Sequence, residues 1–241
     1  MNEPLEPPGV TDAGRLTPPA IGPLRAGNTG VDYVTTFSSG VEGPRVVING
    51  LMHGNELCGA VAVATLFGLG LRPLCGSLTL ALANVAAFQT FDPAQPLAAR
   101  YLDVDLNRLW EPACLDGPLS HRELRRARQL RPIYDQAEVL LDLHSMHLGT
   151  TPLILSGHTA RAAALARRLA FPSWIISDPG HAAGRRLIDY GAFADPAGQA
   201  TALLVECGAH GAAESGRVAV EVCLRLLVAL GMLEPAPFAA W

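Results

Sequence analysis

The stretch RVVINGLMHGNELCGAVAVATLFG, residues 45–68, carries the pattern on which the expected fold depends. It begins with the β-branched run 45–49, which predicts a buried strand. A loop containing glycine follows at 50–55, and the apolar run 57–67 comes next. A membrane span needs about 20 apolar residues, so this run is too short to cross a bilayer and instead predicts a buried helix. The stretch therefore predicts a strand, a loop and a helix in immediate succession.

The same alternation of strands and helices continues along the chain. Further strands are expected at 77–83, 138–143, 153–155, 174–176 and 202–205, and helices at 160–170 and 214–231. Another helix is expected after Ser120, where Ser120 and Glu123 have the spacing of a capping box. Strands that alternate with helices predict an α/β fold: a single domain with a mixed, largely parallel central sheet flanked by helices.

Domain boundaries follow from composition. Residues 1–30 are rich in proline and glycine and are expected to form an N-terminal arm. Residues 31–241 contain no internal repeat and no clear linker, so they are expected to form one folded domain. With 241 residues and a hydrophobic fraction of 49%, the chain is long and apolar enough to bury a sizeable core.

Charge and cysteine content exclude several classes of protein. The formal net charge is −4 and there is no dense run of Lys or Arg, which argues against nucleic-acid binding. No signal peptide or membrane-spanning segment is recognisable. The five cysteines are scattered and form no CxxC pair, which disfavours a disulfide framework and a structural zinc ribbon. We therefore expect a cytoplasmic protein without a membrane or nucleic-acid partner.

Polar side chains stand where several predicted strands end. His53 and Glu56 follow the first strand, His144 follows the strand at 138–143, and Glu206 follows the strand at 202–205. In open α/β sheets, ligands bind at the carboxyl ends of the strands. Two histidines and one glutamate are a typical set of ligands for catalytic zinc. His53 taken alone is better explained as an ordinary loop histidine, and the prediction depends on the combination.

Two further features near these residues leave alternatives open. Asp142 shares a strand face with His144, and it is expected either to hold the imidazole as a hydrogen-bond acceptor or to cap a nearby loop. His147 and His210 are interpreted as loop residues, although both lie close in sequence to the predicted site.

Four motifs in order resemble one known family. They are GLMHGNE at 50–56, RYLDVDLNR at 100–108, DLHS at 142–145 and VECG at 205–208. In order and approximate spacing they are similar to the succinylglutamate desuccinylase/aspartoacylase family, which belongs to the zinc-carboxypeptidase-like superfamily. The resemblance extends from about residue 45 to 210, which is most of the expected domain.

The resemblance implies a role for each matching residue. His53, Glu56 and His144 are implied to hold one Zn²⁺ ion per chain. Glu206 matches the general acid/base, and Arg100 matches the arginine that polarises the scissile carbonyl. The implied reaction is attack of zinc-activated water on an amide bond.

The resemblance also implies a substrate class. Asn107 and Arg108 match the pair that grips a substrate carboxylate, so the implied substrate is a small N-acyl amino acid or a related amide. The alternative within the superfamily is a carboxypeptidase-like metallopeptidase that acts on a peptide or an amino-acid conjugate. The alternative of another class is a catalytically inactive metal-binding module.

Two departures from the family pattern concern the substrate pocket. Aspartoacylase-like members carry an arginine shortly before the catalytic glutamate, whereas the ten residues before Glu206 contain no basic residue. An N-acetylaspartate-like substrate is therefore disfavoured. Arg185 and Arg186 lie farther back in the sequence, and substitution of either for that arginine is left open. The segment after Glu206 also has no match to the C-terminal β-rich domain of longer members. We therefore expect either a more open pocket or a homo-oligomer in which a second subunit covers it.

Overall fold

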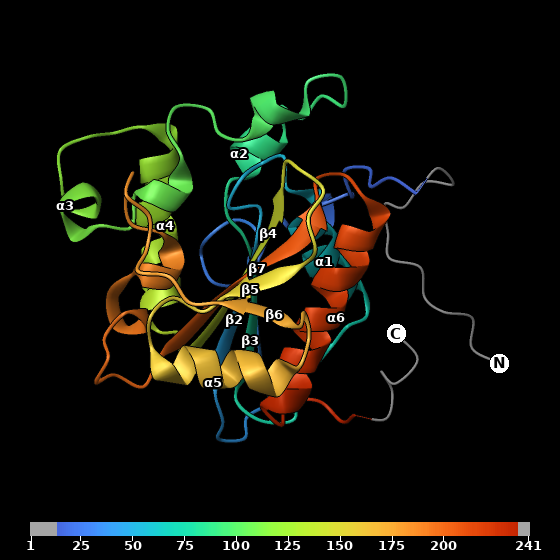
Figure 1. Cartoon of the computed structure of the whole chain (residues 1–241), viewed down its shortest axis with the longest axis vertical. Helices are drawn as coiled ribbons and strands as arrows, with labels where there is room; N and C mark the ends of the chain where they lie inside the picture. Colours follow the sequence, from blue (N-terminus) through green and yellow to red (C-terminus); the bar gives the residue numbers. More distant parts are fainter. Residues whose placement is uncertain (1–13, 236–241) are drawn as a thin grey trace.

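Residues 14–235, which the computed structural model describes, form one seven-stranded sheet with helices on both faces (Figure 1). The strand order is β1-β3-β2-β4-β7-β5-β6. The strands are β1 Val34–Ser38, β2 Arg45–Gly50, β3 Ser77–Leu82, β4 Val139–Met146, β5 Leu153–Leu155, β6 Trp174–Ile176 and β7 Thr201–Ala209.

The strand directions make the sheet mixed and mostly parallel. The four central strands, β3, β2, β4 and β7, are parallel to one another. At one edge β1 is antiparallel to β3, and at the other β5 is antiparallel to β7 and parallel to β6. This arrangement confirms the expected fold class. Strand β1 was not expected, because its sequence VTTFS is short and half polar; it lies along the edge of β3.

Helices cover the two faces of the sheet in separate layers. They are α1 Leu57–Gly68, α2 Val85–Phe88, α3 Pro112–Leu115, α4 Arg122–Asp135, α5 Ala160–Leu169 and α6 Ala213–Ala229. Short 3₁₀ turns lie at Gly22–Leu24, Pro96–Ala99, Leu106–Arg108, Leu187–Asp189 and Gly191–Phe193. Helices α1, α5 and α6 pack on one face, and α4 packs on the other (Figure 1). Each face therefore has its own hydrophobic core, which we call the α1 side and the α4 side.

A pair of glycines brings β2 and α1 into direct backbone contact. A Cβ atom built on Gly50 would lie 2.6 Å from the carbonyl carbon of Gly59, so only glycine allows this approach. The first turn of α1 consequently lies against the end of β2. This contact places Glu56, the residue before α1, beside His53 in the preceding loop.

Helix α4 begins close to where it was expected, but the capping box is wrong. His121 is the N-cap residue, and its side chain makes no capping hydrogen bond. The Glu123 side chain is buried and accepts hydrogen bonds from the backbone N–H groups of residues 102–104 at 2.7–3.3 Å. Those N–H groups belong to a loop outside the helices and strands. The Glu123 carboxylate therefore serves as their hydrogen-bond acceptor and does not cap the first turn of α4.

The described part of the N-terminal segment packs onto the domain. Leu16, Ile21 and Leu24 are buried on the α1 side. The Leu16 N–H also donates a hydrogen bond to the Gly211 carbonyl at 2.8 Å. Residues 1–13 of the expected arm lie outside the described residues. No helix within residues 14–235 has the length and apolar character needed to span a bilayer.

Candidate metal and catalytic site

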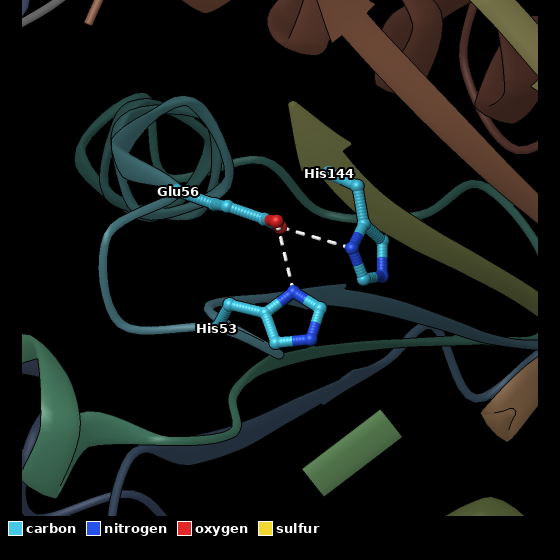
Figure 2. Close-up of side chains that lie close together, drawn as sticks. All are labelled: His53, Glu56 and His144. Carbon is cyan, nitrogen blue, oxygen red and sulfur yellow. Dashed lines mark hydrogen bonds and ion pairs between the residues drawn. The ribbon is translucent and has the colours of Figure 1, made fainter. Parts of the chain in front are cut away.

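Three buried side chains meet at the carboxyl ends of β2 and β4. His53 comes from the loop after β2, Glu56 stands at the start of α1, and His144 lies near the end of β4 (Figure 2). One potential ligand atom of each lies within 4.8 Å of the others. Nδ1 of His53 is 2.8 Å from Oε1 of Glu56, and Nδ1 of His144 is 2.9 Å from Oε2. The three residues implied as metal ligands are therefore brought together.

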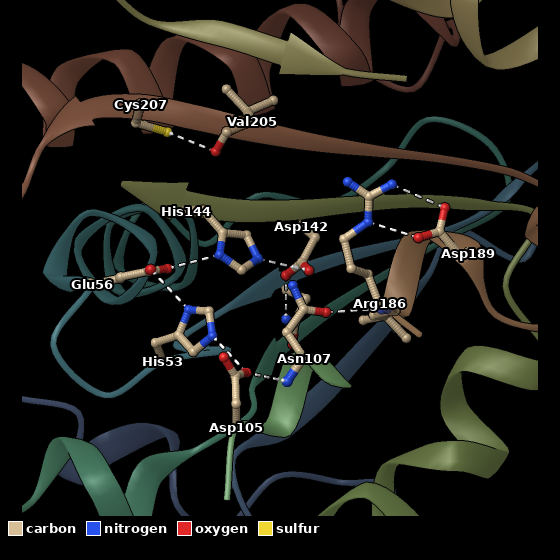
Figure 3. Close-up of polar contacts among 12 residues, drawn as sticks. His53, Glu56, Asp105, Asn107, Asp142, His144, Arg186, Asp189, Val205 and Cys207 are labelled. Carbon is tan, nitrogen blue, oxygen red and sulfur yellow. Dashed lines mark hydrogen bonds and ion pairs between the residues drawn. The ribbon is translucent and has the colours of Figure 1, made fainter. Parts of the chain in front are cut away.

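The far side of each imidazole is held by an aspartate. Nε2 of His53 lies 2.9 Å from Oδ1 of Asp105, and Nε2 of His144 lies 2.9 Å from Oδ2 of Asp142 (Figure 3). Each aspartate accepts a hydrogen bond from Nε2–H, so Nδ1 is the nitrogen that faces Glu56 and would bind a metal ion. Of the two expectations for Asp142, the first is the one observed. The role of Asp105 was not predicted, because 52 positions separate it from His53.

A chain of buried hydrogen bonds continues behind His144. Asn49 on β2 donates from Nδ2 to Oδ1 of Asp142 at 2.7 Å, and Tyr134 on α4 donates its hydroxyl to Oδ1 of Asn49 at 2.8 Å. All of these side chains are at most 2% exposed. Because interiors penalise unpaired polar groups, such a network holds its members in one arrangement. It therefore fixes the orientation of His144 from the α4 side of the sheet.

The electrostatics of the three side chains favour a cation. Burial opposes ionisation of Glu56, but the charges of His53 and His144 outweigh it and hold the pKa of Glu56 well below its usual value. Burial would likewise lower the pKa of His144, yet Asp142 and Glu56 raise it well above the ordinary range. Oε2 of Glu56 is buried and forms an ion pair with Nδ1 of His144 at 2.9 Å, but no hydrogen bond of regular geometry reaches it from the described residues. Two imidazole Nδ1 atoms and one carboxylate that converge on one point suit a divalent metal ion.

Glu206 lies directly beside the ligand cluster. In the β4–β7 register it pairs with His144, so the two side chains are neighbours on the same face of the sheet. Burial raises the pKa of Glu206 to about 7, although His144 and His53 oppose the rise. Oε2 of Glu206 has no hydrogen-bond partner within the described part of the chain. A buried carboxyl group with a pKa near neutrality can both accept and donate a proton.

Arg100 reaches the same cluster from the loop before Asp105. Its guanidinium lies 3.7 Å from Oε1 of Glu56 and donates a hydrogen bond to Oδ2 of Asp105 at 3.1 Å. Its side chain is 34% exposed, so one side of the guanidinium remains open to a ligand. The loop between Arg100 and Asp105 is the segment whose backbone N–H groups are held by Glu123. Glu123 therefore positions this loop, and the capping-box interpretation had hidden that role.

Asn107 and Arg108 follow in the same segment, on the α4 side. Oδ1 of Asn107 accepts the Leu187 N–H at 2.9 Å, which commits its oxygen and leaves its amide nitrogen as the donor for a ligand. The Arg108 guanidinium donates to the Asn107 carbonyl at 2.7 Å. Across residues 14–235, no carboxylate lies within ion-pair distance of Arg108. Its guanidinium is therefore available to a carboxylate from outside the protein.

Arg185 and Arg186 already have carboxylate partners. Arg186 is 5% exposed and pairs with Asp189 at 2.6 Å (Figure 3). It also pairs with Asp178 at 2.6 Å. Arg185 pairs with Glu111 at 2.7 Å. Neither arginine has the unpaired guanidinium that recognition of a substrate carboxylate requires.

The comparisons with known proteins agree with the geometry. The sequence model of the succinylglutamate desuccinylase/aspartoacylase catalytic domain matches residues 42–215. The chain belongs to this family, which confirms the resemblance carried by the four motifs. A search of curated proteins returned no match.

Solved structures share the fold. A succinylglutamate desuccinylase from Silicibacter sp. TM1040 is 19% identical, with a TM-score of 0.67 over 83% of this chain and 61% of that one. A succinylglutamate desuccinylase/aspartoacylase from Rhodobacter sphaeroides is 20% identical, with a TM-score of 0.64 over 85% and 60%. Murine aminoacylase 3 is 23% identical, with a TM-score of 0.55 over 78% and 65%. The chain thus spans about three fifths of the length of these relatives.

Proposed function

We propose that this protein is a zinc-dependent hydrolase that cleaves the amide bond of a small N-acyl amino acid or a related amide. The observation that carries the proposal is the pairing of Glu206 with His144 across β4 and β7, beside the cluster of His53, Glu56 and His144. Membership of the family supports the hydrolysis of an amide bond. The two Nδ1 atoms and the Glu56 carboxylate would hold the ion, and Asp105 and Asp142 would keep both imidazoles in the binding tautomer.

The residues around the cluster divide the reaction among them. A zinc ion held by His53, Glu56 and His144 would supply Lewis acidity toward the attacking water and the scissile carbonyl. Arg100 lies beside Glu56 and donates hydrogen bonds to the carbonyl oxygen as negative charge develops on it. Glu206 accepts the proton of the water and then delivers it to the leaving amine, a role that suits its raised pKa.

Substrate binding uses the α4 side of the site. Arg108 takes the carboxylate of the amino-acid half, since its planar guanidinium can donate two parallel hydrogen bonds. The Asn107 amide nitrogen supports the same carboxylate. Glu123 keeps these residues and Arg100 in register by holding the loop that precedes them.

A carboxypeptidase-like activity is the second candidate. Arg108 would hold the terminal carboxylate of a peptide in the same way that it holds that of an N-acyl amino acid. The two candidates differ in the group on the other side of the scissile bond, which is an acyl group in one case and a peptide in the other.

The test is the release of free amine from two panels of substrates by the purified protein. One panel contains N-acyl amino acids and the other short peptides, each assayed with added Zn²⁺ and after treatment with a chelator. The proposal expects release from the first panel, loss of release on chelation and recovery with Zn²⁺. Release from peptides alone would favour the second candidate. No release above the chelated background from either panel would leave an inactive metal-binding module as the better explanation.

A further inference from the structure

Ser145 and His210 form a hydrogen-bonded pair beside the cluster of His53, Glu56 and His144. The proposed mechanism does not use this pair. Oγ of Ser145 is 2.7 Å from Nδ1 of His210. Ser145 is the residue after His144 and is 4% exposed, whereas His210 is half-buried. The charges of Glu56, Arg100 and His53 all act on the His210 imidazole, which places it within range of the site.

An irregularity in β7 brings His210 to this position. His144 pairs with Glu206, but Met146 pairs with Ala209, so β7 contains one more residue than β4 between these pairs. Gly208 lies in this bulge with φ of +115°, a conformation that favours glycine. Bulges bend a strand and redirect its side chains. The His210 N–H then donates to the Met146 carbonyl at 2.9 Å, which fixes the strand end after the bulge.

The pair lies opposite the residues assigned to the substrate carboxylate. Side chains alternate along β4, so Ser145 continues the series of Leu141 and Leu143 on the α1 side. Asp142 and His144 point to the α4 side, where the segment carrying Asn107 packs. A substrate whose carboxylate binds on the α4 side, with its scissile carbonyl at the cluster, extends its acyl group toward the α1 side.

We propose that His210 contacts the acyl half of the substrate, donating from Nε2 to a hydrogen-bond acceptor that lies beyond the scissile carbonyl. Ser145 is the positioning residue, because a serine hydroxyl that donates to Nδ1 leaves the proton on Nε2. The favoured substrates are N-acyl amino acids whose acyl chain ends in a carboxylate, amide or hydroxyl group. The inference rests on the proposed function, and it assigns acyl recognition to a residue outside the four family motifs.

The pair matters because neither of the two arginines considered for the acyl group is free of carboxylate partners in the part of the chain that the structure describes. The ten residues before Glu206 contain no basic residue, and Arg185 and Arg186 are engaged by carboxylates. A neutral imidazole in that region recognises an acceptor without requiring a full negative charge. Burial lowers the pKa of His210, which keeps the imidazole neutral at physiological pH.

The test compares acyl groups on one amino acid. N-succinyl and N-acetyl derivatives of the same amino acid are assayed, and the ratio of their kcat/KM values is the readout. The His210→Ala variant is expected to lower the succinyl-to-acetyl ratio by about tenfold, the usual effect of losing one hydrogen bond to a charged group. His210→Asn keeps an amide near Nδ1 but lacks Nε2, so it is expected to behave like alanine. His210→Gln places an amide nitrogen near the Nε2 position and is expected to restore most of the ratio.

Two variants separate recognition from structural support. Ser145→Ala is expected to lower the ratio in the same direction, and the double variant Ser145→Ala/His210→Ala should fall no further than His210→Ala alone. His158→Ala removes an exposed histidine after β5 and serves as the matched control with an unchanged ratio.

The outcomes distinguish this inference from the proposed function. If the wild type releases no amine from any N-acyl amino acid, both fail. If it does, and the His210 variants lose activity equally on both acyl groups, the residue has only a structural role and the inference alone is overturned. A drop in ratio that glutamine reverses and asparagine does not would support it, and the asparagine–glutamine comparison remains available if the alanine variant does not fold.

Discussion

The hydrogen-bond chain behind His144 allows a quantitative prediction for Asp142→Asn. In the native protein one oxygen of Asp142 accepts from His144 at 2.9 Å and the other accepts from Asn49 at 2.7 Å. An asparagine is nearly the same size but offers a single acceptor, so it can satisfy only one of these donors. The imidazole of His144 then loses either its tautomer or its orientation.

The expected consequence is weaker metal binding with the fold retained. Loss of a partner behind a metal ligand typically lowers metal affinity about 10- to 100-fold, which is roughly 1.4–2.7 kcal/mol of binding free energy. The assay is competition between the protein and a coloured zinc chelator of known affinity. Asp116→Asn is the control, because it removes the same charge from an exposed ion pair with Arg131.

Tyr134→Phe extends the test to the far end of the chain. Removing the hydroxyl leaves Oδ1 of Asn49 buried without its donor, which should lower the free energy of unfolding by about 1–3 kcal/mol. Its effect on zinc affinity should be smaller than that of Asp142→Asn, because Asn49 still donates to Asp142.

If the Asp142→Asn variant bound zinc as tightly as the Asp116→Asn control, the view that this hydrogen-bond network orients His144 would be refuted.

Three further predictions concern the proton transfer, the loop and pH. Glu206→Gln should lower kcat by about 10²–10⁴-fold. The melting temperature should stay the same or rise, because the substitution removes a buried carboxylate that has an unpartnered oxygen. A melting temperature that falls together with kcat would indicate a structural role. Glu123→Gln replaces one acceptor of the loop N–H groups by a donor. The KM for N-acyl amino acids should therefore rise, and the free energy of unfolding should fall by about 1–3 kcal/mol. An unchanged KM would contradict the positioning role. The metal-free protein should lose stability as pH rises from about 6 to 8, by up to roughly 1.4 kcal/mol per pH unit for each proton involved. The sign follows because the folded pKa values of His53, His144 and Glu206 are raised, so the native state holds more protons than the unfolded chain in this range. The measurement is thermal unfolding of the chelated protein between pH 6 and 8. An increase in stability over this pH range would contradict the raised pKa values of the three side chains.

The local sequence was sufficient for the elements and for the ligand set. Alternating buried runs predicted strands β2 to β7 and helices α1, α4, α5 and α6, because a strand or helix that faces a core must repeat apolar residues with its own period. The short, half-polar strand β1 carries no such signal. His53, Glu56 and His144 were predictable because each follows a buried strand, and parallel strands end at the same edge.

The partners of those ligands were decided by the tertiary structure alone. Asp105 holds His53 across 52 positions of sequence, and Tyr134 reaches Asn49 across 85. No sequence period relates such residues, since their separation depends on how the sheet and α4 pack. The same is true of Glu123, which local spacing assigned to a helix cap although its carboxylate holds a loop 19 to 21 positions away.

The sequence by itself determined that the chain forms an α/β domain, and it indicated His53, Glu56, His144 and Glu206 as the candidates for metal binding and acid–base chemistry. Only the tertiary structure decided which arginines have carboxylate partners within residues 14–235 and which histidine contacts Ser145. Arg108 and Arg186 look alike in the sequence, yet among the described residues Arg108 has no carboxylate within ion-pair distance and Arg186 has two. His210 reaches Ser145 because β7 bulges at Gly208. Both outcomes depend on long-range packing, because the charge and direction of a side chain are set by neighbours that the local sequence does not contain.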